Sequence, residues 1–395
     1  MSIWVSCLRS ARFTKAVGEV SSQTPSDTDD LARPSDICLA NSPRILQTNL
    51  VAQFSMSTKD SSTSSRFSGW SEWQGTDLDW DQALLELADY NIYQSSSWAN
   101  HRADFGWNII RLQNQSPEGC LAQILTKQIL GTTFAWIPGG PVANFDLLTS
   151  QFLQCIAMNT GSKRIFVRLN SLEHTNEQSC EKLRRNSWKQ VSAPLSTGLS
   201  LQYDLTLTEQ TRLEMLSTNW SRNLRRGETR NSKPYEWQDF TPEEIASIYG
   251  QLSQYKGLDS TSDTPNLAVI TSIVANCKTN LKIFRCDDEQ GNALAIRGAL
   301  LLGNKAWDIF AAATPQGRKQ YSSYTTAWSL FNSCADSQIT QYDLSGIDPV
   351  KNKGVYDFKH GTGATEIKYV GEWDNGTPFY VQPLVGRLIR YRKNL

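Results

Sequence analysis

From about residue 70 onward, apolar and polar positions recur along the chain with two different periods. Runs that alternate every second residue predict β-strands, and stretches with apolar residues three or four positions apart predict helices. Predicted strands and helices alternate, which is typical of an α/β fold. The segment 91–113 is expected to form a strand, a helix and another strand. The other expected strands are 121–126, 133–137, 164–169, 281–286, 293–302, 306–312, 339–344 and 366–372. The expected helices are 78–90, 145–158, 242–256 and 324–334.

The stretch 341–374 has the most informative pattern. A strand leads through a loop with Gly and Pro into a short helix that carries Tyr356, Phe358 and Lys359, and a second strand follows. Two glycines after the helix allow a sharp turn of the backbone. A loop and helix that cross between two strands at the carboxyl end of a sheet are a common ligand site in α/β proteins.

Length and composition indicate a globular protein of two domains. The chain has 395 residues, of which 39% are hydrophobic and 20% charged, as in ordinary soluble proteins. Its formal net charge is zero, so binding to nucleic acid or anionic lipid would need a local patch of charge.

The cysteines and histidines give little support for a metal or redox site. None of the eight cysteines has Cys-x-x-Cys spacing, so we expect reduced thiols and a cytoplasmic protein. Only three histidines are present, and we expect His101 and His174 to be structural. No apolar run reaches the roughly 18 residues that a membrane-spanning helix needs. Residues 1–69 are rich in Ser and Thr with little periodic pattern, which predicts a disordered tail.

The motif YDLSGID at 342–348, followed by GVYDFKHGTGATEIKYVGEWD at 354–374, resembles the C-terminal signature of the Fem family (FemA, FemB, FemX). That family comprises the aminoacyl-tRNA-dependent transferases that add amino acids to the peptide of peptidoglycan precursors. The resemblance implies two GNAT-like domains in tandem: 70–200, completed by 375–395, and 201–374. Because the chain lacks sustained heptads in its second domain, it is similar to the armless FemX type.

The first domain carries a weaker part of the same resemblance, in Gln94, Ser95, Trp98 and Arg102. Arg102 stands where FemX-like enzymes have a Lys that contacts the phosphates of the nucleotide-linked precursor. The alternative is an ordinary exposed charge on a helix. Trp98 is a candidate for stacking on a base, although most tryptophans of a globular protein belong to the core.

A basic segment at 222–233 is a candidate surface for phosphates. It contains five cations and the single acid Glu228, and its cations are Arg222, Arg225, Arg226, Arg230 and Lys233. Such a run is often a solvated helix face, but it suits the phosphates of tRNA or of a nucleotide-linked precursor. The resemblance favours the second interpretation, because 223–225 fits an Asn-Ile-Arg element of the family. It also makes Lys256 a candidate ligand of the precursor diphosphate.

Aminoacyl transfer needs an aligned amine, a route for its proton and donors for the oxyanion. By resemblance, Lys359 stabilises the developing negative charge, Phe358 packs against the tRNA end, and Tyr356 contributes to substrate binding. Without the resemblance, Phe358 would be core and Lys359 surface. Candidate general bases are Asp343, Asp348 and His360, and Asp343 could instead cap the loop that follows it.

The expected partners are aminoacyl-tRNA and a UDP-linked or lipid-linked muropeptide, with peripheral membrane contact in the second case, and the expected state is a monomer. No cofactor is expected. The segment 314–323 stands where acetyltransferases bind acyl-CoA, but it lacks the Arg/Gln-x-x-Gly-x-Gly/Ala spacing. Two alternatives remain: an N-acyltransferase that uses an acyl-CoA or acyl-carrier donor, and a non-catalytic protein that binds tRNA or the precursor.

Overall fold

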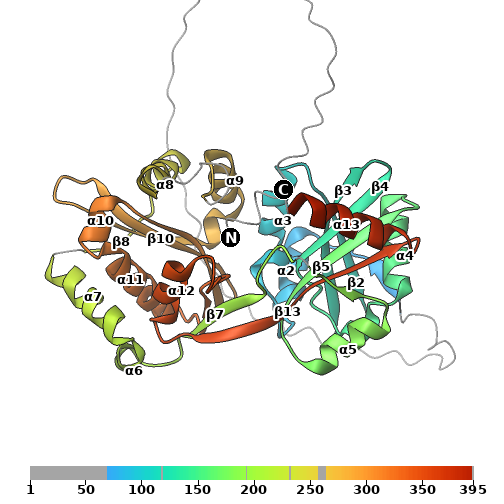
Figure 1. Cartoon of the computed structure of the whole chain (residues 1–395), viewed down its shortest axis with the longest axis horizontal. Helices are drawn as coiled ribbons and strands as arrows, with labels where there is room; N and C mark the ends of the chain where they lie inside the picture. The colour runs from blue at the N-terminus through green and yellow to red at the C-terminus, as the bar shows by residue number, and fades with distance from the viewer. Residues whose placement is uncertain (1–68, 117–118, 193, 231–232, 257–263, 394–395) are drawn as a thin grey trace, which may run out of the picture. The chain divides into compact units, whose positions relative to one another are not determined.

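A continuous sheet of thirteen strands organises the residues that the structure, a computed structural model, describes (Figure 1). These residues are 69–116, 119–192, 194–230, 233–256 and 264–393. The tail predicted at 1–69 lies outside the described residues, apart from Gly69.

The first half of the sheet consists of antiparallel strands followed by a parallel one. After the antiparallel strands, α4 (Ser150–Thr160) crosses over and leads to β5, which pairs with β4 in parallel. The strands are β1 (Trp70–Glu72), β2 (Asn108–Asn114), β3 (Cys120–Ile129), β4 (Thr132–Gly139) and β5 (Ile165–His174).

The second half repeats this plan. After antiparallel strands, α10 (Pro315–Lys319) and α11 (Ser322–Asp336) cross over to β12, which pairs with β11 in parallel. The strands are β8 (Tyr235–Glu236), β9 (Leu281–Asp287), β10 (Ala293–Leu302), β11 (Lys305–Ala313) and β12 (Gln341–Asp343). Crossover helices of this kind are what parallel neighbours require.

Two long-range strands join the halves. β7 (Leu199–Asp204) pairs with β12 and with the first residues of β13 (Thr365–Thr377). The remainder of β13 pairs with β5, and the short β6 (Lys189–Gln190) also pairs with it. The register shifts between Tyr369 and Gly371, where Gly371 has a φ of 75°. Such a bulge bends a strand and lets β13 serve both halves.

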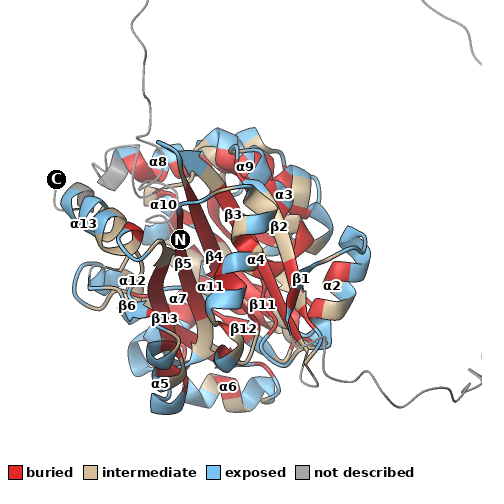
Figure 2. Ribbon diagram, turned by 90° about the vertical axis from the view of Figure 1, so that its right-hand side faces the viewer, coloured by how far each residue is buried: buried red, intermediate tan, exposed pale blue. Residues whose placement is uncertain are grey.

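Helices cover both faces of the sheet, and most strand residues lie buried between them (Figure 2). Against the first half, α4 packs with one apolar cluster, while α13 packs through Val381, Val385 and Ile389 against a second. The remaining helices are α2 (Asp77–Leu85), η1 (Ile92–Gln94), α3 (Ser96–Ala103), η2 (Phe145–Leu147), α5 (Glu177–Arg185), α6 (Glu209–Met215), α7 (Thr218–Thr229), α8 (Pro242–Lys256), α9 (Leu267–Cys277), η3 (Lys278–Asn280), α12 (Lys353–His360) and α13 (Val381–Lys393).

Two segments differ from the predicted pattern. The strand expected at the start of the segment 91–113 is the 3-10 helix η1, because the Asn91 side chain accepts from Tyr93 N and donates to the carbonyl oxygen of Gly139 at 2.7 Å. The helix expected at 145–158 divides into η2 and α4, since Thr149 begins α4 as its N-cap. Helix α8 has the predicted bounds, and Thr241 and Glu244 form its capping box.

The described cysteines are all free thiols. Among the described helices, none has the length and apolar character that a membrane span would require. In the same part of the chain, no cluster of His, Cys, Asp and Glu has the arrangement of a metal site.

Candidate active site

Helix α12 carries the Phe-Lys pair and packs on α7 and α11 through Phe358. The ring of Phe358 lies 5.8 Å from that of Trp220 and 5.0 Å from that of Tyr324. The indole of Trp220 donates to the carbonyl oxygen of Phe358 at 3.1 Å, and the guanidinium of Arg297 lies 5.2 Å from the Phe358 ring centroid. Phe358 is half-buried, so this packing fixes α12 and leaves part of the ring accessible.

Lys359 points inward. Its side chain is buried, and Nζ donates to the carbonyl oxygens of Ser345 at 3.1 Å and Gly346 at 3.2 Å. Burial lowers the pKa of Lys359 to about 8, and the nearby Arg297 also lowers it. The interpretation of Lys359 as a surface charge is therefore wrong. An ammonium group with such a pKa can give up a proton near neutral pH.

Asp343 is buried at the end of β12 and accepts three hydrogen bonds. The donors are Ser345 N at 2.7 Å, the Tyr369 hydroxyl at 2.7 Å and the Ser200 hydroxyl. Asp343 thus caps the turn after β12. Ser345 in that turn has a φ of 61°, which is uncommon for a residue other than Gly. Lys359 and Asp343 are brought together by this turn, because both are hydrogen-bonded to the Ser345 backbone.

A buried ion pair that sequence reasoning missed lies beneath the turn. Arg297 of β10 and Asp308 of β11 are joined by two hydrogen bonds, of 2.8 and 3.0 Å. Asp308 also accepts from the Tyr342 hydroxyl at 3.0 Å, and its backbone carbonyl accepts from Ser345 Oγ at 2.6 Å. The sequence did contain a signal for this ion pair, because Arg297 and Asp308 each lie inside a mostly apolar strand, where an unpaired charge would be costly.

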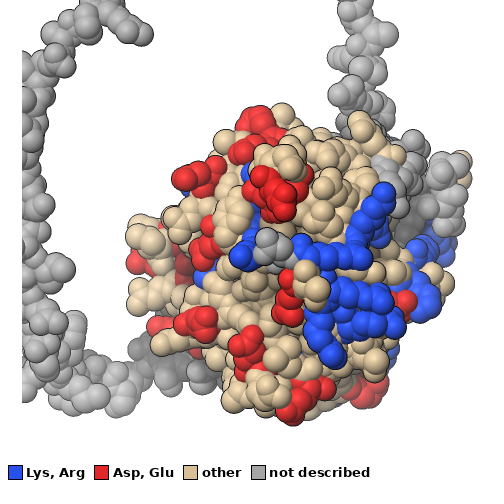
Figure 3. Space-filling model, turned by 90° about the vertical axis from the view of Figure 1, so that its left-hand side faces the viewer, with Lys and Arg blue, Asp and Glu red and all other residues tan. Residues whose placement is uncertain are grey.

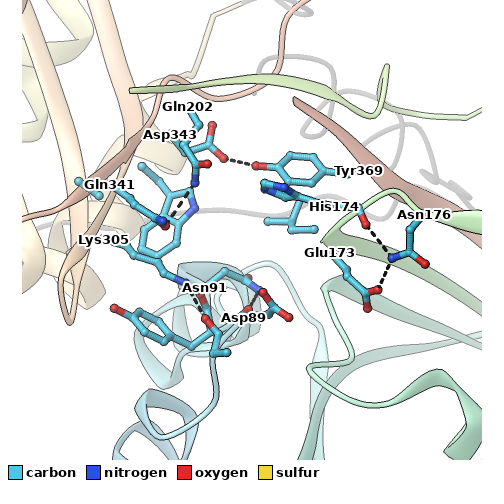
Figure 4. Close-up of a pocket in the computed structure, with 15 residues that line it drawn as sticks. Asp89, Asn91, Glu173, His174, Asn176, Gln202, Lys305, Gln341, Asp343 and Tyr369 are labelled. Carbon is cyan, nitrogen blue, oxygen red and sulfur yellow. Dashed lines mark hydrogen bonds between the residues drawn. The ribbon is translucent and has the colours of Figure 1, made fainter. Parts of the chain in front are cut away.

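A cavity of about 390 Å³ lies where the strands of the two halves meet (Figure 4). Its wall is polar and is formed by both halves. It carries carboxylates, amides and one ammonium group. The polar lining residues are Asp89, Asn91, Glu173, His174, Asn176, Gln202, Lys305, Gln341, Asp343 and Tyr369. Of the site residues predicted from sequence that the structure describes, Asp343 is the one in this lining. A second cavity of about 410 Å³ shares Ala88, Asp89 and Glu173 with it, so the two are neighbours.

Two groups of this wall are held in place by hydrogen bonds. Lys305 Nζ donates to the carbonyl oxygen of Ala88 at 2.8 Å and lies 4.2 Å from the centroid of the Tyr90 ring. Tyr369 is bound to Asp343, and burial followed by the Asp343 charge raises its pKa well above the ordinary value. Tyr369 is therefore a neutral donor at neutral pH, and His174 packs at 6.1 Å from its ring.

The α7 basic surface comprises the exposed Arg222, Arg225, Arg226 and Arg230. It belongs to a concentration of Lys and Arg on one face of the molecule (Figure 3). Among the described residues, none of these four arginines has an ion pair with a carboxylate. Arg226 and Arg230 lie 5.6 and 4.9 Å from the centroid of the Tyr321 ring. In the segment predicted to bind phosphates, the positive charges of these four arginines are thus not paired with carboxylates of the described residues.

The first-domain candidates lie in the core. Trp98 is buried, with its ring 4.9 Å from that of Tyr93. Arg102 is also buried, its guanidinium lies 5.5 Å from the centroid of the Trp136 ring, and burial lowers its pKa to about 10. The interpretation of Arg102 as an exposed helix charge is therefore wrong. Its Nε has no hydrogen-bond partner among the described residues.

The other candidates are dispersed. Tyr356 donates to Glu366 at 3.3 Å on the surface, and the exposed His360 packs at 5.3 Å from the Tyr356 ring. Asp348 accepts from two backbone N–H groups of its own loop. His101 is structural, since it is buried with Nδ1 2.8 Å from Ser272 Oγ. Lys256 is the last residue of α8, and its side chain lies outside the described part.

Comparisons with known proteins give a family match and several similar folds. Residues 246–393 match the family model described as the FemAB family, and this range includes Asp343, Phe358 and Lys359. The crystal structure of FemX aligns with a TM-score of 0.67 and 14% identity over 81% of this chain and 100% of that chain. A conserved protein of unknown function from Bacteroides thetaiotaomicron VPI-5482 aligns with a TM-score of 0.50 and 12% identity, over 77% of this chain and 98% of that one.

A tandem GNAT protein from the clavulanic acid biosynthesis pathway aligns with a TM-score of 0.45 and 9% identity, over 78% of this chain and 98% of that chain. A sequence search among curated proteins finds no match. The predicted resemblance to the Fem family is confirmed by the family match, and the predicted α/β fold class is confirmed by the strands and helices and by the FemX alignment. The family match supports a function of the aminoacyltransferase type.

Proposed function

We propose that the protein transfers an amino acid from aminoacyl-tRNA to the amine of a peptidoglycan precursor peptide. The proposal is carried by one observation: the FemAB match spans a buried lysine, Lys359, that shares a turn with the buried carboxylate Asp343. A cation beside a carboxylate at the end of a sheet strand suits charge stabilisation and proton transfer during acyl transfer.

The reaction requires no covalent intermediate on the protein. The acceptor amine attacks the ester carbonyl, the carbon–oxygen bond to the tRNA ribose breaks, and the amine proton goes to the departing hydroxyl. In our proposal, Lys359 stabilises the oxyanion of the tetrahedral intermediate. Its lowered pKa also suits transfer of a proton to the ribose oxygen that leaves.

The acceptor peptide is proposed to occupy the 390 Å³ cavity. Asp89, Glu173 and Asp343 supply carboxylates to its wall, which suit an ammonium group of the incoming peptide. Asn91, Gln202 and the other amides offer donors and acceptors to peptide bonds. Asp343 would lie at the acceptor amine, and the buried Arg102 stays a predicted contact for precursor phosphates.

The donor tRNA is proposed to bind the α7 basic surface. Helix α7 is tied to the Phe-Lys helix by the bond from Trp220 to the Phe358 carbonyl. Phosphates on Arg222 and Arg225 would therefore be bound beside α12, where Phe358 and Tyr356 are predicted to meet the acceptor end. In this proposal the tRNA binds residues 201–374. The precursor binds 70–200 with 375–395 and also meets the part of the cavity wall that 201–374 contributes, and the protein acts as a cytoplasmic monomer.

An acyl-CoA donor is a weaker candidate. In the segment 314–323, the backbone N–H of Gly317 donates to Thr314 Oγ at 3.1 Å, and that of Arg318 donates to the Thr314 carbonyl at 3.0 Å. A Cβ on Gly317 would lie 2.0 Å from the carbonyl oxygen of Leu294. This glycine thus allows close packing against β10, and these N–H groups are already used within the segment.

The test uses purified full-length protein with tRNA charged with radiolabelled amino acids. UDP-linked and lipid-linked muropeptides serve as separate acceptors, and labelled acetyl-CoA replaces the tRNA in parallel reactions. We expect transfer that ribonuclease treatment of the donor abolishes. Transfer from acetyl-CoA would contradict the proposal, as would tRNA binding without transfer to any acceptor. Mass spectrometry of muropeptides from cells with and without the gene identifies the amino acid added.

A further inference from the structure

Helix α13 carries apolar side chains on two sides. Val381, Val385 and Ile389 pack against the first half of the sheet. On the outer side, Leu384, Leu388 and Tyr391 are 57%, 51% and 66% exposed, at the three- and four-residue spacing of one helix face. A helix that is apolar on both sides of its axis is normally covered on both. Figure 2 shows the outer side of α13 carrying exposed residues.

The apolar outer side continues around the end of the sheet. Phe379, which precedes α13, is 88% exposed, and Leu130 in the β3–β4 turn is 81% exposed. The strand register places these segments at the same end of the sheet, because Thr133 of β4 and Thr377 of β13 both pair with Ile165, the first residue of β5. Exposed aromatic and aliphatic side chains are thus gathered at this end of the sheet.

Cations accompany these apolar residues. Arg387 and Arg390 are exposed on α13, and Lys163 and Arg164 are exposed just before β5. The segments 127–133, 158–164 and 377–393 contain no Asp or Glu. Pairing this surface with a second copy of itself would bring cations against cations, which opposes association.

We propose that this surface, the α13 face, binds the surface of an anionic phospholipid bilayer. Helices with apolar side chains flanked by Lys and Arg lie in the membrane interface in this way, with the apolar groups at the level of the acyl chains and the cations at the headgroups. Aromatic residues such as Phe379 and Tyr391 suit the same depth. The inference does not rest on the proposed transferase activity, although membrane binding would bring the protein to a lipid-linked acceptor.

The experiment measures sedimentation of the full-length protein with phosphatidylcholine vesicles that contain or lack phosphatidylglycerol. We expect binding to the anionic vesicles that added salt weakens. Leu384→Ser with Leu388→Ser should lower vesicle affinity by about tenfold per leucine. Arg387→Gln with Arg390→Gln should lower it by about fivefold per arginine. Because these side chains are exposed, the thermal midpoint of each variant should match that of the wild type.

Two control variants test whether binding belongs to this face. Leu78→Ser changes a leucine that is 82% exposed on α2, and Arg222→Gln with Arg225→Gln removes two cations from the α7 basic surface. Both controls should bind vesicles as the wild type does. The proposal is overturned if no vesicle binds, if the α13 variants bind normally, or if the α7 variant loses binding instead. It is also overturned if sedimentation velocity shows a dimer that the Leu384 and Leu388 substitutions dissociate.

Discussion

Lys359 and Ser345 are joined by a hydrogen bond of 3.1 Å from the ammonium group to the backbone carbonyl oxygen. The same Ser345 donates its backbone N–H to Asp343. A cation on α12 and a carboxylate at the end of β12 are therefore hydrogen-bonded to the C=O and the N–H of one residue. Movement of the turn would move both groups, so their separation is fixed by the backbone.

Replacing Lys359 tests its predicted catalytic role. Lys359→Met should lower kcat for aminoacyl transfer by about 100- to 1,000-fold, the usual cost of removing an oxyanion donor. tRNA affinity, measured by filter binding, should change little. Lys359→Arg is the control, and it should retain more activity because it keeps the positive charge. Loss of tRNA binding together with turnover would indicate a role in binding instead.

The buried ammonium group also makes stability depend on pH. Lys359 titrates at about 8 in the folded protein and near 10.5 when unfolded. Between these values the unfolded chain binds more protons, so the free energy of unfolding should rise with pH by roughly 3 kcal/mol from this group. Urea unfolding of the wild type and Lys359→Met, at pH values below 8 and near 10, isolates the effect. An identical pH dependence in both proteins would contradict it.

The α7 basic surface predicts a salt-dependent affinity for tRNA. Arg222→Gln with Arg225→Gln should raise the dissociation constant and lower the slope of log affinity against log salt by roughly 1.4 to 1.8, if each arginine contacts one phosphate. Arg185→Gln, on the exposed side of α5, is the control and should leave the slope unchanged. Equal effects of the two changes would argue against a specific tRNA surface.

The bond between Tyr369 and Asp343 should affect acceptor binding. Tyr369→Phe removes a donor from a buried carboxylate and should destabilise the protein by about 1 kcal/mol. It should also raise KM for the acceptor peptide more than it changes kcat. Tyr235→Phe removes a similar bond, of 2.8 Å to Asp287, on the exposed strand β8 and is the matched control. An unchanged KM would show that Tyr369 does not contribute to binding of the acceptor peptide.

Substitution of glycine by alanine should have opposite effects on stability at Gly317 and at Gly250. Gly317→Ala would place a methyl group against the Leu294 carbonyl oxygen and should destabilise the fold by about 3 kcal/mol. Nothing lies within 4 Å of a Cβ on Gly250 in α8, so Gly250→Ala should stabilise it by about 0.5 kcal/mol. Thermal unfolding of both variants measures the difference. A stable Gly317→Ala protein would show that α10 can shift away from β10 at little cost.

Local pattern predicted most of the fold. The apolar repeats of β10 and α8 match their observed bounds, because a buried strand or helix face leaves a periodic signal. The 3-10 helix at 92–94 was missed, since it depends on the bond from Asn91 to the distant Gly139. Asn91 and Gly139 are far apart in the chain, so a local sequence pattern cannot contain both partners of this hydrogen bond.

The site was predicted less completely for the same reason. The family motif made Lys359 and Asp343 candidates, and both are hydrogen-bonded to Ser345 in the turn after β12. The cavity wall combines residues from five strands and two loops, including Asn91, His174 and Lys305. Each is unremarkable in its own segment and becomes a neighbour of Asp343 only through the pairing of strands far apart in the chain. The burial of Arg102 also depends on Trp136 of β4, which is distant in the chain.

The order in which the ribosome makes this chain has a consequence for β13. The strand that completes both β5 and β7 is made after all the other strands of the described sheet. Until then, the hydrogen-bonding edges of β5 and β7 are open to other nascent chains, which is the arrangement most prone to aggregation. Newly made protein should therefore benefit from chaperones that shield these edges until β13 has been made.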